Sequence, residues 1–177
     1  NMDVLTDLSY AYEMVNDFES SVRINNMVLD LDPYSYESWI NIGKLYSLQS
    51  EYDKAIDAFE FALTIDDTHN DVYKLKAHCL LLCNREEEAI RIFEECSVRN
   101  PDDENLYYAL SECYFSLEQY DKMLEQLDKY EELKGESALI CAKKAAAYLQ
   151  KGDADKALYF LEKGFHLDPV NDELNMM

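Results

Sequence analysis

Residues that form tight turns are scarce in this chain of 177 residues. It has only 4 glycines and 3 prolines, and these two residue types dominate tight turns. Apolar residues make up 48% of the sequence, which is enough to bury a sizeable core in a chain of this length. The sequence therefore predicts long helices that are joined by few, short turns.

Long apolar runs and basic residues are lacking as well. No run approaches the roughly 18 apolar residues that cross a bilayer, and no basic flank leads from Asn1 into an apolar stretch as in a signal peptide. Only 16 basic residues stand against 37 acidic ones, for a net charge of -21. This charge repels a phosphate backbone and an anionic lipid surface. We therefore expect neither nucleic acid nor a membrane as a partner.

The cysteines give no sign of a disulfide framework. There are 5, an odd number, and none belongs to a Cys-x-x-Cys pair. A chain of this length does not depend on disulfides for its core, so this usage is typical of a reducing compartment. We expect the protein to be cytoplasmic.

The prolines reveal an internal period. They stand at Pro33, Pro101 and Pro169, so that the two gaps between them are equal. Midway in the two gaps lie Asp67 and Gly135. Proline disfavours a helical conformation in the residue before it, and glycine closes helices in the left-handed conformation. Helices therefore end at a regular interval, which is half of the gap between successive prolines.

One window carries a specific pattern in this register. From residue 36 to residue 69 the spaced residues are Trp39, Ile42, Gly43, Tyr46, Ala55, Phe59 and Ala62. This window resembles the tetratricopeptide repeat, whose pattern is Trp-x2-Leu-Gly-x2-Tyr, then Ala-x3-Phe, then Pro, with a period of about 34 residues. The same pattern recurs along the chain at this period, without insertion or deletion. The expected repeats are residues 2–35, 36–69, 70–103, 104–137 and 138–171, within a single domain of residues 1–177.

The resemblance implies an all-α fold, an α-solenoid of stacked antiparallel helix pairs that forms a right-handed superhelix. Three positions depart from the pattern, because Lys76 and Lys144 stand in the Leu place and Asn25 stands in the Phe place. The inner helices are expected near 2–15, 36–49, 70–83, 104–117 and 138–151, and the outer helices near 18–31, 52–65, 86–99, 120–133 and 154–167. The turns within the pairs should contain Asn16, Ser50, Asn84, Glu118 and Gly152.

The last residues suggest that the array continues. Residues 172–177 read as the start of a further inner helix that is cut short. Arrays of this kind usually end in a helix whose outer face is polar. We therefore expect this chain to be a piece of a longer array.

Catalytic and metal-binding patterns are not found. The sequence has no Gly-x-Ser-x-Gly, no glycine-rich phosphate loop and no His-Glu-x-x-His, and its three histidines do not cluster. Cys79 and Cys83, four residues apart, could form half of a metal site, but the cysteines occupy core places of the repeat and are better explained as small apolar residues. We predict no enzyme activity, no cofactor and no metal. The pairs and triplets of glutamate at residues 86–88, 94–95 and 131–132 are interpreted as solvated faces of outer helices.

The resemblance also implies where a partner would bind, because in this family the inner helices line a concave groove for an extended peptide or a partner helix. The residues expected in this groove are Tyr10, Glu13, Glu37, Asn41, Lys44, Lys74, His78, Tyr108, Glu112 and Phe115. Chaperone-binding members hold a C-terminal carboxylate with Lys and Asn on a first inner helix, Asn on the second, and Lys and Arg on the third. Only Asn41 and Lys74 agree with that set, since Thr6 and Tyr10 replace its first pair and His78 replaces its Arg. Too little positive charge remains for a carboxylate clamp.

The groove residues change in character along the chain. The acidic ones gather near the first end, at Asp3, Asp7, Glu13 and Glu37, and the apolar ones follow toward Leu82, Tyr108, Phe115 and Leu149. We therefore predict a non-enzymatic interaction scaffold for a protein or peptide partner, which carries a basic segment and hydrophobic anchors. Two alternatives stay open. The apolar residues could contact only neighbouring helices or a sixth repeat, and the chain could be a regulatory or oligomerisation segment of a longer enzyme or transcription regulator. The sequence gives no indication of the oligomeric state.

Overall fold

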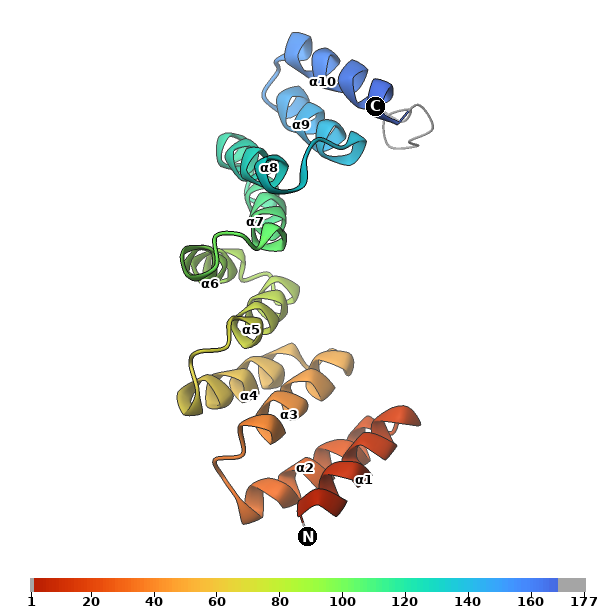
Figure 1. Ribbon diagram of the computed structural model, residues 1–177, viewed down its shortest axis with the longest axis vertical. Helices are drawn as coiled ribbons and strands as arrows, with labels where there is room; N and C mark the ends of the chain where they lie inside the picture. Colours follow the sequence, from red (N-terminus) through yellow and green to blue (C-terminus); the bar gives the residue numbers. More distant parts are fainter. Residues whose placement is uncertain (1, 169–177) are drawn as a thin grey trace. The chain divides into compact units, whose positions relative to one another are not determined.

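The computed structural model describes residues 2–168, and these residues form ten helices and no strand (Figure 1). The helices are α1 (Met2–Met14), α2 (Phe18–Leu31), α3 (Tyr36–Leu48), α4 (Tyr52–Ile65), α5 (Asn70–Leu82), α6 (Glu86–Arg99), α7 (Glu104–Ser116), α8 (Tyr120–Lys134), α9 (Ala138–Gln150) and α10 (Ala154–Leu167). All ten helical ranges that the sequence predicts are confirmed to within one residue at each end. The expected further helix at 172–177 and the turn at Pro169 lie outside the described residues.

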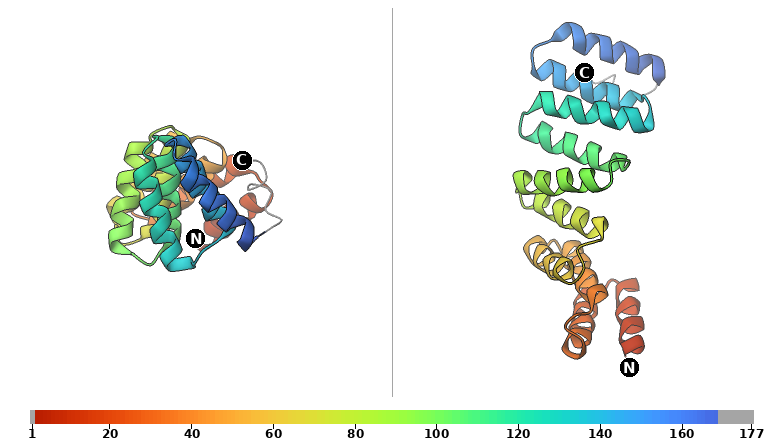
Figure 2. Two further views of the ribbon diagram at one scale, coloured as in Figure 1. Left: turned by 90° about the horizontal axis from the view of Figure 1, so that it is seen from above. Right: turned by 60° about the vertical axis from the view of Figure 1, so that its left-hand side comes forward.

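The helices pack in antiparallel pairs, which makes the fold an α-solenoid. The chain divides into two compact units, residues 1–92 and residues 93–177, and each is described by itself. In the first unit α1 packs on α2, α2 on α3, α3 on α4, and α4 on α5. In the second unit α7 packs on α8, α8 on α9, and α9 on α10, and Figure 2 shows α9 and α10 running side by side in opposite directions.

A left-handed residue turns the chain between the two helices of each pair. Positive φ angles occur at Asn16 (58°), Ser50 (60°), Asn84 (55°), Glu118 (57°) and Gly152 (77°). The five residues are those that the sequence places in these turns, one at the same place in each repeat. The following helix begins with a cap in two of the five pairs, where the side chains of Asp17 and Asp153 accept hydrogen bonds from the backbone amides of Ser20 and Lys156, each at 3.1 Å. Local turn chemistry therefore sets where the helices begin and end.

Small residues allow the helices of a pair to approach closely. A Cβ atom added to Gly43 on α3 would lie 2.5 Å from the ring of Phe59 on α4, far inside van der Waals contact. Ala55 and Ala62 on α4 are fully buried. The pattern positions of the repeat are thus packing positions, and they make up much of the core.

The three residues that depart from the repeat pattern are polar residues in or near the core, and each has polar partners. Lys144 on α9 is buried and its Nζ lies 2.5 Å from Asp128 Oδ1 and 2.6 Å from Glu131 Oε2 on α8. Lys76 Nζ lies 2.8 Å from Glu60 Oε1. The amide of the buried Asn25 donates a hydrogen bond to Ser9 Oγ at 2.6 Å. Each departure is therefore compensated by a polar contact between helices.

The interpretation of the glutamate clusters as solvated faces is wrong for Glu131, whereas Glu94 is exposed but also makes a contact between helices. The side chain of Glu131 is only 15% exposed because it pairs with the buried Lys144. Glu94 accepts a hydrogen bond of 2.6 Å from the hydroxyl of Tyr114. Both residues lie on outer helices at places where the next inner helix packs, so their contacts depend on residues 13 and 20 positions further along the chain.

Candidate protein-binding surface

Seven of the ten predicted site residues belong to the first unit and lie on its inner helices α1, α3 and α5. Tyr10 on α1 is 63% exposed, and Glu37 and Lys44 on α3 are exposed as well. Asn41, which lies between Glu37 and Lys44 in the sequence, is half-buried. Glu13 differs, because its carboxylate accepts a hydrogen bond from Ser21 Oγ at 3.3 Å and so is tied to its own helix pair. A partner could reach Tyr10, Glu37 and Lys44 without any rearrangement.

Lys74 and His78 on α5 offer little positive charge. Lys74 Nζ lies 2.7 Å from Asp71 Oδ1, and this contact lowers the pKa of Asp71. Burial lowers the pKa of His78, and the charge of the nearby Lys74 lowers it further. His78 is therefore neutral at physiological pH, and the charge of Lys74 is balanced by its neighbour.

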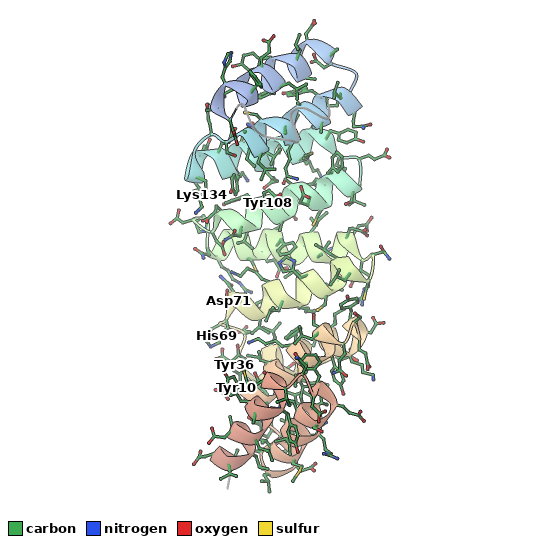
Figure 3. All side chains as sticks on the ribbon, turned by 90° about the vertical axis from the view of Figure 1, so that its right-hand side faces the viewer. Tyr10, Tyr36, His69, Asp71, Tyr108 and Lys134 are labelled. Carbon is green, nitrogen blue, oxygen red and sulfur yellow. The ribbon has the colours of Figure 1, made fainter. Side chains whose placement is uncertain are left out.

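An acidic cluster that the sequence reasoning missed lies at the start of α3 and α5. The ring of Tyr36 packs on His69 with 5.2 Å between the centroids, and His69 Nε2 lies 3.3 Å from Asp66 Oδ2. Burial raises the pKa of Tyr36, and the charges of Asp66, Glu37 and Asp71 raise it further. Figure 3 shows Tyr36, His69 and Asp71 close to one another. The period could have revealed this cluster, because Tyr36 and His69 are the first and last residues of one repeat.

The other three predicted site residues lie on α7 in the second unit. Tyr108, Glu112 and Phe115 follow a helical spacing of four and three residues, so that they share one face of α7. Lys143 on α9 reaches this face, because its Nζ lies 2.8 Å from Glu112 Oε1 and 5.2 Å from the centre of the Tyr108 ring. The structure therefore brings Tyr108 and Glu112 together through Lys143, which is not among the predicted site residues.

The neighbours of Lys143 stabilise its positive charge. Burial acts to lower the pKa of Lys143, but the hydrogen bonds and charges of Glu112 and Tyr108 outweigh it, so the pKa is raised. Tyr108 is itself packed against Tyr130 of α8, with 5.8 Å between the ring centroids. Lys143 is thus a fixed cation at physiological pH, held by an acidic and an aromatic neighbour.

Apolar side chains lie exposed on the same two inner helices. Phe115 on α7 is 40% exposed, and Leu139 and Leu149 on α9 are 36% and 45% exposed. At the edge of this unit, Lys134 Nζ lies 2.8 Å from Glu104 Oε1, and Figure 3 shows the positions of Lys134 and Tyr108. We call Tyr108, Glu112, Phe115, Lys143 and Leu149 the α7/α9 surface. It combines exposed apolar groups with fixed charges.

Other kinds of site find little support in residues 2–168. No group of three or more His, Cys, Asp or Glu side chains in this part is arranged to hold a metal ion. Burial raises the pKa of the thiols of Cys79, Cys83 and Cys141, so these cysteines are thiols and not reactive thiolates. Within the same residues no helix has the length and apolar character that crossing a membrane requires.

Comparisons with known proteins agree with the repeat pattern. The family model described as tetratricopeptide repeat matches residues 36–69 and again residues 104–136. Among solved structures, that of a MamA protein superposes with a TM-score of 0.86 and 22% identity, covering 95% of this chain and 92% of that one. YrrB, described as a TPR protein with an unusual peptide-binding site, superposes with a TM-score of 0.81 and 20% identity, covering 97% of this chain and 89% of that one. At these identities the structures establish the fold alone.

Curated relatives are much longer than this chain. BBSome complex member BBS4 of Bos taurus is 27% identical over a segment that covers 73% of this chain and 25% of that protein. Anaphase-promoting complex subunit 3 of Schizosaccharomyces pombe is 26% identical, covering 84% of this chain and 27% of that protein. The Hsp70-Hsp90 organizing protein of Triticum aestivum is 34% identical, covering 59% and 18%. The chain thus spans about a quarter of the length of the first two relatives.

Proposed function

Because the chain is a tetratricopeptide-repeat protein, we propose that it is a non-enzymatic interaction scaffold whose inner helices bind a polypeptide partner. The observation that carries this proposal is the α7/α9 surface, where exposed Phe115 on α7 and Leu149 on α9 accompany the ion pair of Lys143 and Glu112. A surface on which exposed apolar side chains lie near fixed charges suits a peptide in which apolar and polar side chains alternate. The names of two relatives as members of protein complexes agree with this role.

The partner of the first unit should be basic. Glu37 and Asp66 contribute negative charge near Tyr36, whereas the charges of Asp71 and Lys74 balance each other and His78 is neutral. The net charge of the whole chain is also negative, at -21. A segment rich in Lys or Arg would be attracted to this surface, and hydrophobic side chains of the partner would bind the α7/α9 surface of the second unit.

A random peptide library displayed on phage tests this proposal without a known partner. Peptides that are selected on the purified chain should be enriched in Lys or Arg together with Leu or Phe. The double substitution Tyr108→Ala and Phe115→Ala should weaken the selected peptides at least about tenfold, because two central anchors are lost. The substitution Val98→Ala, at an exposed residue of α6, is the control and should leave binding unchanged.

A second double variant tests the acidic residues on the inner helices of the first unit. Glu13→Lys combined with Glu37→Lys should weaken basic peptides and should make the remaining binding less sensitive to salt. Selected peptides that bind both double variants as tightly as the original chain, at low and at high salt, would show that the partner does not bind the inner helices.

A second function is supported by the length of the relatives. The chain covers 8% of the General transcriptional corepressor trfA of Dictyostelium discoideum, at 23% identity, so comparable repeats occur as a small part of a long regulator. In this alternative the chain is a regulatory or oligomerisation segment of a longer enzyme or transcription regulator, and its surface packs on another part of that protein. We propose a cytoplasmic location for either role, since all five cysteines are free.

A further inference from the structure

Two aromatic rings form an exposed stack between α3 and α4, the two helices of the second repeat. The ring of Trp39 on α3 and the ring of Phe61 on α4 have 4.6 Å between their centroids and 20° between their planes. The indole is fixed in position, because its Nε1 donates a hydrogen bond to the carbonyl oxygen of Pro33 at 3.1 Å. The side chain of Phe61 is nevertheless 54% exposed. We call Trp39 and Phe61 the aromatic platform.

The platform lies on helices that already have neighbours on both sides. Within the first unit α3 packs on α2 and α4, and α4 packs on α3 and α5. Phe61 stays exposed because part of its ring lies on the side of α4 that these neighbours leave open. Further repeats before or after this chain would stack on other helices, so they would leave Phe61 exposed.

The fourth repeat has the same frame with a different occupant. Tyr107 takes the place of Trp39, and its hydroxyl donates the equivalent hydrogen bond, to the carbonyl oxygen of Pro101 at 2.9 Å. Lys129 takes the place of Phe61, and its Nζ lies 5.4 Å from the centre of the Tyr107 ring. This frame therefore accommodates a cation against an aromatic ring.

Packing of the repeat does not require an aromatic residue at the place of Phe61. The five repeats hold Met27, Phe61, Glu95, Lys129 and Lys163 there. Three of the five are charged, as is typical of a place that water reaches. Aromatic residues are enriched where proteins contact partners. Phe61 thus offers contact area that the fold itself does not use.

The surroundings of the platform are acidic. Residues 18–65, which include α2, α3 and α4, have eight acidic and three basic residues, a net charge of -5. Asp57 is exposed on α4 one helical turn before Phe61, so the two side chains are neighbours on the helix surface. Glu60 is paired with Lys76 at 2.8 Å, whereas Asp57 belongs to no ion pair of residues 2–168. A cation that contacts Phe61 would therefore meet the carboxylate of Asp57.

A guanidinium group suits this combination better than an ammonium group. It is planar and weakly hydrated, so it stacks on an aromatic ring, and it can bind a carboxylate through two parallel hydrogen bonds at the same time. An ammonium group is compact and strongly hydrated, and it does not stack. The platform and Asp57 together thus select for arginine over lysine.

We propose that the aromatic platform and Asp57 bind arginine side chains of a basic polypeptide partner. A guanidinium group stacks on the ring of Phe61 and donates hydrogen bonds to Asp57. The site is separate from the predicted groove, because Glu37 and Asn41 on α3 lie about 160° from Trp39 around the helix axis. The proposal therefore goes beyond peptide binding by the inner helices.

Fluorescence of the full chain tests the proposal directly, because Trp39 is its single tryptophan. Hexaarginine should change the Trp39 emission in a saturable manner. Hexalysine, which carries the same charge, should bind at least about fivefold more weakly, since it lacks the stacking group. Equal affinities of the two peptides would show that the negative field alone attracts them, and the proposal would be wrong.

Two substitutions remove the parts of the site one at a time. Phe61→Ala and Asp57→Asn should each weaken hexaarginine at least about fivefold, measured by calorimetry so that the altered surroundings of the indole do not matter. Both residues are exposed, so the circular dichroism spectrum should not change. The matched controls are Val98→Ala and Glu87→Gln at exposed residues of α6, and both should bind like the original chain.

The groove variant separates this site from the inner helices. If Glu13→Lys with Glu37→Lys abolishes hexaarginine binding while Phe61→Ala leaves it unchanged, the peptide binds the inner helices and the proposal is wrong. An emission of Trp39 that does not respond to hexaarginine also contradicts the proposal, and it leaves the function proposed for the inner helices untouched. Loss of binding in Phe61→Ala with selected groove peptides still bound supports two separate sites.

Discussion

Lys144 is a charged residue at a position where the repeat pattern has leucine, and its side chain is only 4% exposed. Asp128 and Glu131 balance its charge from the preceding helix. A buried charge that loses its partner costs several kcal/mol, whereas replacing a whole buried pair by uncharged groups is often neutral. The pair therefore substitutes for the usual apolar contact.

Lys144→Leu should consequently destabilise the protein although it restores the repeat pattern. We expect a loss of about 3 kcal/mol in the free energy of unfolding, because the side chain of Glu131 is only 15% exposed and would lose the cation that balances its charge. Adding Glu131→Gln should recover most of this loss. Urea unfolding of the two variants measures both effects, and a single variant as stable as the original chain would contradict the role of the pair.

Tyr114 should make the free energy of unfolding depend on pH in the alkaline range. Burial raises the pKa of Tyr114, and the hydrogen bond to Glu94 raises it further. A pKa that is higher in the folded state contributes stability below the unfolded pKa of about 10, and this contribution is lost as the pH rises above it. Unfolding by urea should therefore become easier between about pH 9 and about pH 12.

Tyr114→Phe should weaken this dependence, because it removes the titrating hydroxyl. At neutral pH we expect the variant to lose about 1 kcal/mol, since a hydrogen bond to a partly solvated carboxylate is broken. Tyr34→Phe, at a tyrosine that is 78% exposed, is the matched control. An equal pH dependence in the Tyr114 and Tyr34 variants would show that other groups cause the effect.

The helices could be predicted from the sequence, but their ion pairs could not. Each helix end is determined by nearby residues such as Asn16 or Gly152 in the turn, and these recur once in every repeat. The contacts of Lys143 with Glu112 and of Lys144 with Glu131 join residues 31 and 13 positions apart. They depend on which long side chains meet between successive repeats, and the repeat pattern does not specify those residues. The helices that carry the candidate surface could therefore be predicted, while the charge pairing on them could not.

The turns between paired helices offer a test at the level of the element. Glu118 adopts φ 57°, a conformation that costs a residue with a Cβ atom about 1 kcal/mol. Glu118→Gly should therefore raise the free energy of unfolding by about 0.5 kcal/mol, after the greater freedom of glycine in the unfolded chain is included.

The reverse substitution at the equivalent turn should have the opposite sign. Gly152 adopts φ 77°, and an added Cβ atom would meet nothing within 4 Å. Gly152→Ala should still destabilise the protein by about 0.5 kcal/mol, because the cost of the backbone conformation exceeds the gain from the lower freedom of alanine in the unfolded chain. Thermal unfolding of both variants measures the two shifts. A stabilising Gly152→Ala would show that the turn is not held in the left-handed conformation.

At the scale of the whole molecule, the net charge of -21 is the dominant electrostatic feature. Exposed ion pairs such as Lys163 with Glu136 contribute at most about 1 kcal/mol each, and the 16 basic residues cannot balance 37 acidic ones. Repulsion among the unbalanced carboxylates should therefore act against the folded state more strongly than the exposed pairs support it.

Salt should accordingly stabilise the protein. Raising NaCl from about 20 mM to about 300 mM shortens the Debye length to less than about 8 Å, and we expect the Tm to rise by about 3 °C, which corresponds to about 1 kcal/mol for a chain of this size. Glu132→Lys, at an exposed residue of α8, removes two units of net charge and should show a smaller rise. A Tm that falls with salt would mean that pairs such as Lys143 with Glu112 outweigh the repulsion, and salt would then weaken the α7/α9 surface together with the fold.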